Sequence, residues 1–234
     1  MPLAKVVEIR RYPIKSLLGE QLTAVDVEQR GLEGDRLWAV RDGDGKLGSG
    51  KNTRRFRRMP GLLSLRGRGV GADTVVELAD GQRFAADDLD AHAALSQALN
   101  RSVTVAREAE VIHHDEGPVS VITTAGLRRL SDLVGEPVDR TRFRANLLVD
   151  VPGSGFPEDD WLDHVLRVGP SVKLRVRRPL TRCVMVDLAQ DHVPEHGRIL
   201  KTLADRHGMS FGVWATVEAG GRISIGDTVS LGQH

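Results

Sequence analysis

The residue best suited to chemistry is the single cysteine of this 234-residue chain, and it lies in a basic segment. Arg182 precedes Cys183 directly, and Arg177 and Arg178 lie a few residues upstream. Nearby guanidinium groups favour the thiolate form of a cysteine, which is both a nucleophile and a soft ligand for a transition metal. Free cysteine is also among the most often buried residue types, and Val184 beside it has core character. The segment therefore predicts either a reactive or metal-binding thiolate or a buried thiol.

A second candidate site lies where a predicted strand, residues 119–123, meets a predicted helix. Thr124 is a typical helix N-cap, and leucines recur at helical spacing after it until Gly135. A helix N-terminus presents free N–H groups and the positive end of the helix dipole. The hydroxyls of Thr123 and Thr124 could therefore bind an anion there, although helix capping alone would explain one of them.

A third candidate is the pair Arg144 and Asn146, which we expect on one face of a strand over residues 146–151. Such a pair can present a guanidinium and an amide to one polar ligand. The alternative is an exposed arginine next to an asparagine at a turn.

The composition limits the classes of partner. Lysine and arginine (33) nearly balance aspartate and glutamate (32), so the net charge favours neither nucleic acid nor a membrane surface. The basic run at residues 51–58 holds one aromatic residue, too few for stacking single-stranded nucleic acid. No apolar run approaches membrane-spanning length, and no secretory leader is recognisable. We therefore expect a cytoplasmic protein with no nucleic-acid or membrane partner.

One cysteine also excludes an internal disulfide, an iron–sulfur cluster and a cysteine-based zinc site. The elements that must position the candidate residues are mostly short alternating segments between glycine-rich turns, which predict a mainly β fold. We predict helices near residues 87–99, 124–134 and 194–207 and strands at residues 4–12, 22–28, 36–41, 74–79, 102–106, 119–123, 146–151, 172–178, 211–218, 222–225 and 228–231.

Several motifs together resemble the MOSC family, the domain found at the C-terminus of molybdenum-cofactor sulfurases. Residues 181–183 resemble its Thr-Arg-Cys signature, and residues 142–146 resemble its Arg-Phe-Arg-Pro-Asn block. Residues 156–161 resemble its Phe-x-Glu-Asp-x-Trp block, and residues 12–16 and 31–36 resemble two motifs of the MOSC N-terminal region. The motifs occur in the family order and span most of the chain.

The resemblance implies a mainly β (α+β) fold: a MOSC-type β-barrel with a small α+β subdomain and a few peripheral helices. The barrel would combine the first strands of the chain, within residues 1–60, with its C-terminal half. The MOSC N-terminal region would comprise residues 1–110, including the α+β subdomain at about residues 62–108, and the MOSC domain would comprise residues 111–234.

The resemblance also implies the molybdenum cofactor (Mo-molybdopterin), a pterin dithiolene with a phosphate that holds one molybdenum. Cys183 would be the catalytic residue and would ligate the metal through its thiolate. Trp214 aligns with a tyrosine of the family, so it could stack but lacks the hydroxyl. The full set of implied cofactor contacts is Lys15, Ser16, Arg36, Thr123, Thr124, Arg144, Asn146, Thr181, Arg182 and Trp214.

The mitochondrial amidoxime-reducing component and its bacterial relatives, which this chain resembles, remove oxygen from N-hydroxylated compounds. The resemblance therefore implies an oxidoreductase with a small N-oxygenated substrate. Because the chain ends at His234 without the fused ferredoxin domain of some bacterial relatives, we expect a separate electron-donor reductase. The pyridoxal-phosphate desulfurase domain of full sulfurases is absent, so we do not expect cysteine desulfuration.

The resemblance leaves two other functions open. One is a carrier that holds sulfurated molybdenum cofactor without turnover. The other is a cofactor-free thiol enzyme with Cys183 as its nucleophile, which would need a base close in space. Two segments differ from the amidoxime-reducing proteins: the residues that follow Cys183, and the residue before Asn146, which is Ala145 where the family has proline. The resemblance therefore implies the cofactor more directly than it implies the substrate.

Overall fold

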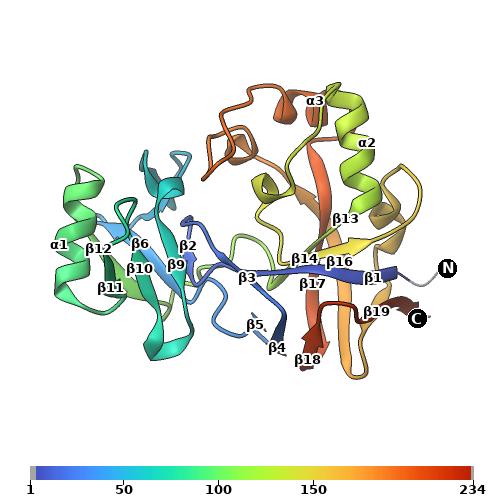
Figure 1. Ribbon diagram of the computed structural model, residues 1–234, viewed down its shortest axis with the longest axis horizontal. Coiled ribbons are helices and arrows are strands. Elements are labelled where there is room, and N and C mark those ends of the chain that lie inside the picture. The colour runs from blue at the N-terminus through green and yellow to red at the C-terminus, as the bar shows by residue number, and fades with distance from the viewer. Residues whose placement is uncertain (1–3, 233–234) are drawn as a thin grey trace.

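The chain folds into two lobes that lie side by side, as the computed structural model shows for residues 4–232 (Figure 1). The larger lobe contains β1 (Ala4–Arg11), β3 (Glu20–Leu22), β13 (Val119–Thr123), β14 (Leu147–Asp150), β15 (Val165–Val168), β16 (Val172–Thr181), β17 (Ser210–Ala219) and β19 (Thr228–Gly232). A small sheet beside these strands contains β4 (Ala24–Glu28), β5 (Gly31–Leu32) and β18 (Gly221–Ser224).

The smaller lobe contains β2 (Ile14–Lys15), β6 (Trp38–Asp42), β7 (Leu47–Ser49), β8 (Phe56–Arg58), β9 (Arg66–Arg68), β10 (Val75–Glu77), β11 (Arg83–Ala85) and β12 (Val103–Arg107). The α-helices are α1 (Leu89–Ala98), α2 (Thr124–Val134) and α3 (Ile199–Arg206). The 3₁₀-helices are η1 (Leu62–Ser64), η2 (Gly71–Asp73), η3 (Arg140–Phe143), η4 (Pro157–Trp161) and η5 (Val184–Val186).

The larger lobe is a closed barrel, so the predicted mainly β fold is confirmed. Its strands follow the order β14–β13–β17–β16–β15–β19–β1, and β1 pairs back onto β14. The ring closes where Lys5 lies opposite Asp150 and Ala4 lies opposite Val229. Only the β13–β14 pair in this ring is parallel.

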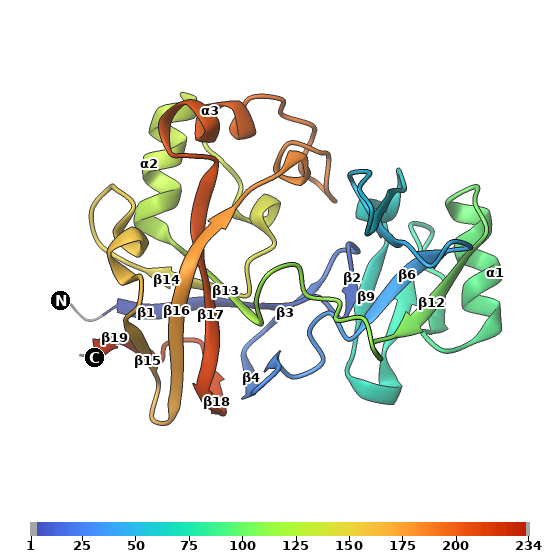
Figure 2. The ribbon, with the colours of Figure 1, turned by 180° about the vertical axis from the view of Figure 1, so that it is seen from behind.

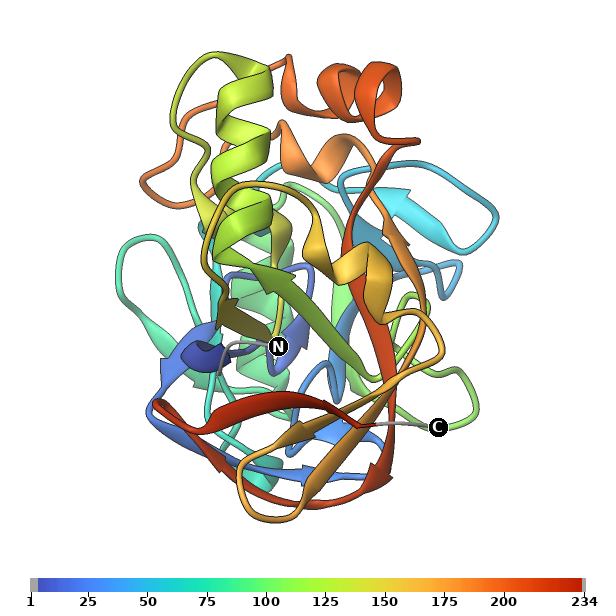
Figure 3. The ribbon, with the colours of Figure 1, turned by 90° about the vertical axis from the view of Figure 1, so that its right-hand side faces the viewer.

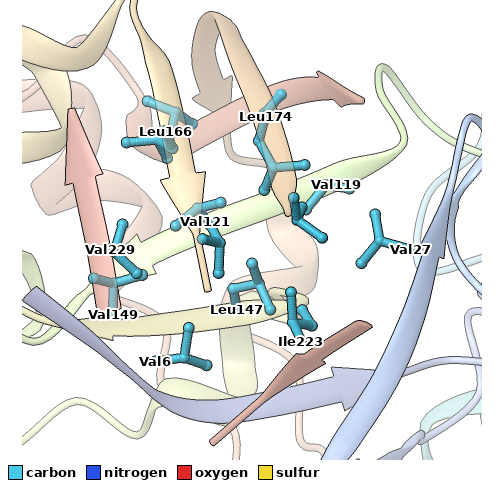
Figure 4. Packing of buried hydrophobic residues seen from close by; sticks show 14 of the residues in the cluster. Val6, Val27, Val119, Val121, Leu147, Val149, Leu166, Leu174, Ile223 and Val229 are labelled. Carbon is cyan, nitrogen blue, oxygen red and sulfur yellow. The ribbon is translucent and has the colours of Figure 1, made fainter. Parts of the chain in front are cut away.

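The barrel interior is filled mainly by aliphatic side chains from residues 4–32 and 119–229. In β16, Val172, Leu174 and Val176 are buried while the residues between them face outward, which is the period-two pattern of a strand. These side chains meet others from β1 and β13, such as Val6 and Val121 (Figure 4). The apolar alternation that predicted the strands is therefore what fills the core.

Helices α2 and α3 lie together at one end of the barrel, where a second apolar cluster joins them to it (Figure 3). Leu130 of α2 and Leu203 of α3 are buried against Ile122 and Phe211. Helix α3 begins at Ile199 and not at residue 194 as predicted, because Gly197 has a left-handed φ of 79° that no α-helix accommodates.

The smaller lobe has its own core, in which Ile14, Trp38, Leu62, Leu95 and Val105 are packed together. Its larger sheet follows the order β12–β6–β7–β8, with β2 paired to β6, and β9–β11 form a second sheet. This α+β unit is thus larger than the predicted residues 62–108. Of the strands before residue 60, β1 lies in the closed barrel with β3 paired to it, while β2 and β6–β8 belong to the smaller lobe.

Strand β16 is longer than predicted, since it continues through Pro179 to Thr181. Its pairing with β17 is irregular on both sides of Pro179, where the register shifts. A bulged ladder tolerates a residue without an N–H, which explains why proline does not end the strand. As a result β16 delivers Arg182 and Cys183 to the end of the barrel nearest the smaller lobe. Within residues 4–232, no helix has the length and apolar character that crossing a bilayer requires.

Candidate functional site

Figure 2 shows the two lobes side by side, with β2 in the smaller lobe and β16 in the larger one. A pocket of about 120 Å³ lies at their junction, where Lys15 of β2 and Thr181 at the end of β16 both line it. Segments far apart in the sequence line it together. The lining residues are Lys15, Ser16, Arg36, Ser49, Lys51, Asp115, Glu116, Ser120, Arg142, Phe143, Arg144, Leu180, Thr181, Arg182, Cys183, Met185, Val186 and Trp214.

The lining is strongly cationic, with six lysine or arginine side chains against two carboxylates. Lys15 is only 4% exposed, and its Nζ donates to Asp115 Oδ1 at 2.7 Å. Burial lowers the pKa of Lys15 to about 8, so this ammonium is mostly protonated at neutral pH. A concave surface with this excess of positive charge attracts anions.

Tyr12 and Asp35 hold two of the arginines in place. The guanidinium groups of Arg36 and Arg144 lie over the ring of Tyr12, at 4.9 and 4.4 Å from its centroid. The buried carboxylate of Asp35 accepts from the backbone N–H of Tyr12 at 2.8 Å and from the side chain of Arg36. The motifs at residues 12–16 and 31–36 therefore meet in space and form one wall of the pocket.

Three residues of the lining have left-handed backbone conformations that are uncommon for residues other than glycine. Ser16, Arg36 and Arg144 have φ values of 66°, 53° and 51°. Each such residue costs about 1–2 kcal/mol. Strained residues of this kind gather at functional sites, where the surrounding structure holds them in place.

Three side chains that line the pocket carry buried N–H groups without a hydrogen-bond partner among the described residues. Arg182 is 6% exposed, and its Nε and Nη1 donate to the carbonyls of Phe211 and Phe143, both at 2.8 Å. Its Nη2 has no partner within residues 4–232, and the same is true of Arg144 Nη1 and Trp214 Nε1. A buried donor left unpaired is unfavourable by about 1–3 kcal/mol. The lining residues therefore carry donors whose hydrogen bonds are not satisfied by the described residues.

Both of these arginines carry charge at neutral pH. Burial lowers the pKa of Arg182 to about 9 and the pKa of Arg144 to about 10, values that still lie above 7. Cys183 lies directly beside Arg182, is partly exposed and lines the same pocket. The arrangement brings one thiol and several fixed cations to one ligand space.

Eight of the residues predicted from the sequence line this pocket, and three do not. Those that line it are Lys15, Ser16, Arg36, Arg144, Thr181, Arg182, Cys183 and Trp214. The three that lie elsewhere are Thr123, Thr124 and Asn146, and each has a structural partner.

The two threonines stabilise the start of α2. Thr123, not Thr124, is the N-cap: its Oγ1 accepts from the N–H of Gly126 at 2.9 Å. The same hydroxyl donates to Glu158 Oε2 at 2.6 Å, and the Thr124 hydroxyl donates to Asp150 Oδ1 at 2.7 Å. Their hydroxyls are thus occupied, and neither residue lines the pocket.

The predicted alternation of Arg144 and Asn146 along one strand is wrong. Arg144 ends η3 in a left-handed conformation, and β14 begins only at Leu147. Asn146 is buried, and its Oδ1 accepts from the N–H and the hydroxyl of Ser120 at 3.0 and 2.8 Å. Asn146 therefore positions Ser120, which does line the pocket.

Several lining residues did not stand out in the sequence as site residues. Asp115 pairs with Lys15, which lies 100 residues away in the sequence, and no local sequence pattern predicts such a pair. Of the basic run at residues 51–58, Lys51 alone lines this pocket. Arg142 and Phe143 belong to the motif at residues 142–146 but were not predicted as cofactor contacts. The remaining lining residues that were not predicted are Ser49, Glu116, Ser120, Leu180, Met185 and Val186.

Glu158 gives a prediction about stability. This buried carboxyl group holds Thr123 through Oε2, while its Oε1 has no partner among the described residues. Burial raises the pKa of Glu158 from 4.5 to about 7. The folded state therefore binds more protons than the unfolded state between these values, so Glu158 lowers stability as the pH rises from 4.5 to 7. This fall in the free energy of unfolding amounts to about 3 kcal/mol in full, and Glu158→Gln should remove it.

Urea unfolding of the wild type and Glu158→Gln across pH 4.5–8 measures this effect as the difference between the two curves. Glu28→Gln, at an exposed position of β4, is the matched control and should follow the wild type. Parallel curves for wild type and Glu158→Gln would contradict the prediction.

The closed barrel and the cationic, cysteine-containing pocket define a β-barrel protein suited to an anionic ligand. The comparison with family models then makes the assignment specific: the model described as the MOSC domain matches residues 108–230, and the model described as the MOSC N-terminal beta barrel domain matches residues 3–114. The chain belongs to the MOSC family. This family is linked to binding of the molybdenum cofactor.

One solved structure agrees with the fold. The YUAD protein from Bacillus subtilis has a TM-score of 0.54 at 14% sequence identity, covering 97% of this chain and 94% of that one. YiiM from Geobacillus stearothermophilus has a TM-score of 0.36 at 17% identity, covering 50% of this chain and 55% of that one. No functionally curated protein matches the sequence.

Proposed function

We propose that this protein is a cytoplasmic oxidoreductase that binds the molybdenum cofactor in the pocket between its lobes and reduces small N-oxygenated compounds. A separate reductase would supply the electrons. The observation that supports this proposal best is the group of buried, unpartnered N–H donors on Arg182 and Arg144 beside the partly exposed thiol of Cys183.

The residues of the pocket fit this cofactor. A phosphate needs charge-assisted donors, which Lys15, Arg36 and Arg144 offer. The free Trp214 Nε1 can donate to a pterin acceptor, and the thiolate of Cys183 is the soft ligand that molybdenum would take from the protein. Ser16, Thr181 and Arg182 complete the set of residues that would hold the group.

The bound cofactor would supply the two-electron chemistry, while the protein binds and orients the reactants. Reduction of an N-hydroxylated compound breaks its N–O bond, consumes two electrons from the reductase and two protons, and releases the oxygen as water. Lys15 holds a proton at Nζ inside the pocket, and Asp115 fixes that ammonium at 2.7 Å. The apolar side chains of Leu180 and Val186 form part of the wall of the same space.

The test is to produce the protein in a host that makes the cofactor and to measure three quantities: molybdenum by elemental analysis, pterin by fluorescence after oxidation, and turnover of acetamidoxime with reduced viologen. We expect close to stoichiometric metal and pterin, and formation of the amidine. Protein from a cofactor-deficient strain of the same host is the matched control.

The other outcomes separate the alternatives. Metal and pterin without turnover, although the viologen reduces the bound cofactor, would identify a carrier. Neither metal nor pterin, in a host shown to load another molybdenum enzyme, would overturn cofactor binding and favour a thiol enzyme. Turnover that persists in protein from the deficient strain would overturn the role of the cofactor.

A further inference from the structure

A second cavity, of about 210 Å³, adjoins the pocket that contains Cys183. Ser16 and Met185 line both spaces, so the two are neighbours with a shared wall. The two spaces differ in chemistry: the first is cationic, whereas the second is lined mainly by methionine, leucine, proline and alanine side chains.

The walls of the second cavity come from both lobes. Met59, Leu62 and Leu63 of the smaller lobe form one side, and all three are buried. Met185 and Leu188 of the barrel lobe form the other side. The charged residues of this lining, Arg58 and Glu195, are both exposed and so lie at its rim.

Met185 is held at the boundary between the two spaces. The backbone N–H of Gly50 in the smaller lobe lies 3.2 Å from Met185 Sδ. A Cβ at Gly50 would come within 2.4 Å of that sulfur and within 2.6 Å of Leu188, so the lobes approach here as closely as glycine allows. The shared wall is therefore a thioether, a flexible and polarisable group that adapts to the shape of its neighbour.

We propose that the second cavity binds the apolar part of the substrate, an alkyl chain or an aryl ring, while the N-oxygenated group lies in the first pocket beside Cys183. This inference rests on the proposed function and adds the substrate class: amphipathic molecules with a small polar head and an apolar body. The boundary residue Met185 would sit at the junction of the two parts.

The size and the lining support this occupant. An apolar cavity of about 150 Å³ in another protein holds benzene, so a space of about 210 Å³ accommodates a ring or chain of that size. Small-molecule sites are typically apolar with a few polar groups that fix orientation. Here the polar groups lie in the adjoining pocket, and the two methionines, Met59 and Met185, can adjust to bodies of different shape.

The experiment uses a series of alkyl amidoximes from methyl to hexyl, which share one head and differ in tail length. Dissociation constants are measured by calorimetry on the protein as purified, and turnover is measured in parallel with reduced viologen. Each methylene that enters the cavity should tighten the dissociation constant about fourfold, until the cavity is full.

Ala189→Trp tests whether the tail lies in this cavity. Ala189 lines the cavity and is exposed, so the indole can fill the space without disturbing the core. This variant should bind the methyl compound as the wild type does and lose most of the gain from longer tails. Ala93→Trp, at an exposed position of α1, is the matched control and should keep the full gain.

The outcomes distinguish this inference from the function on which it rests. Affinity that does not change with tail length, or a gain that persists in Ala189→Trp, overturns the inference, whether or not the amidoximes are reduced. A gain that Ala189→Trp abolishes, without turnover of any amidoxime, supports the apolar subsite and overturns the proposed reduction. Turnover of the amidoximes, together with a gain in affinity that Ala189→Trp abolishes, supports both the apolar subsite and the proposed function.

Discussion

Replacing Cys183 with alanine is expected to lower turnover of an N-hydroxylated substrate by at least about 100-fold, since changes to groups that merely support a metal ligand cost 10–100-fold. Cys183 is the single cysteine of the chain and opens into the cationic pocket. Loss of its thiolate should change the metal content or the electronic spectrum of the bound molybdenum. Stability should change little, because the side chain is only partly buried.

The measurement combines turnover with reduced viologen, molybdenum analysis and urea unfolding. Val184→Ala, at the exposed neighbouring position, is the matched control and should retain both metal and turnover. Cys183→Ser keeps the size of the side chain and removes the soft ligand, so it should resemble the alanine variant. Wild-type metal, spectrum and turnover in Cys183→Ala would exclude Cys183 as a ligand.

Arg182→Ala is expected to lower the free energy of unfolding by about 3 kcal/mol and to empty the pocket of cofactor. The side chain donates to the carbonyls of Phe143 and Phe211, and each carbonyl left unpaired costs about 1–3 kcal/mol. Its guanidinium also lies 5.2 and 5.7 Å from the ring centroids of the same two residues. One side chain thus joins η3 to β17, and its Nη2 has no hydrogen-bond partner among the described residues.

Urea unfolding and molybdenum content measure the two effects separately. Arg182→Lys keeps the charge but cannot reproduce the planar set of donors, so it should fall between the wild type and Arg182→Ala. Arg177→Ala is the control: Arg177 is exposed and its Nε donates to Thr216 alone among the described residues, so the change should stay within about 0.5 kcal/mol. An Arg182→Ala protein as stable and as metal-rich as the wild type would contradict this account.

The strands were predictable where one segment is apolar throughout, as in β13, or alternates between apolar and polar residues, as in β16. In β13 the predicted and observed bounds coincide, at Val119–Thr123. Closure of the barrel was not predictable in this way, because the pairs that close it, such as Lys5 with Asp150, depend on partners far away in the sequence. The same applies to β2 and β6–β8, which precede residue 60 like the barrel strand β1 but pair within the smaller lobe.

The site was predictable where a motif holds the functional residues together, as in residues 181–183. It was not predictable where the hydrogen-bond partner of a side chain lies far away in the sequence. The local sequence around Thr123 and Thr124 is compatible with an anion site at a helix N-terminus. In the structure, however, their hydroxyls donate hydrogen bonds to the carboxyl groups of Glu158 and Asp150. Asp115 shows the reverse: the sequence around it did not predict a site residue, yet its carboxylate lines the pocket and accepts a hydrogen bond from Lys15.

The pairing of β1 has a consequence for how the protein is made. β1 leaves the ribosome first, but its neighbours β14 and β19 follow only after residues 147 and 228 have been synthesised. Meanwhile β6 to β12, residues 38–107, form a continuous stretch that can fold as it emerges. Strand β3 can pair early with residues 9–11 of β1, but the edge that receives β14 and the start of the strand that receives β19 stay open during that time. An open strand edge is the state in which strands associate wrongly. The pocket, whose walls include residues up to Trp214, is therefore complete only after the C-terminal strands β17 and β19 have been synthesised and the barrel has closed.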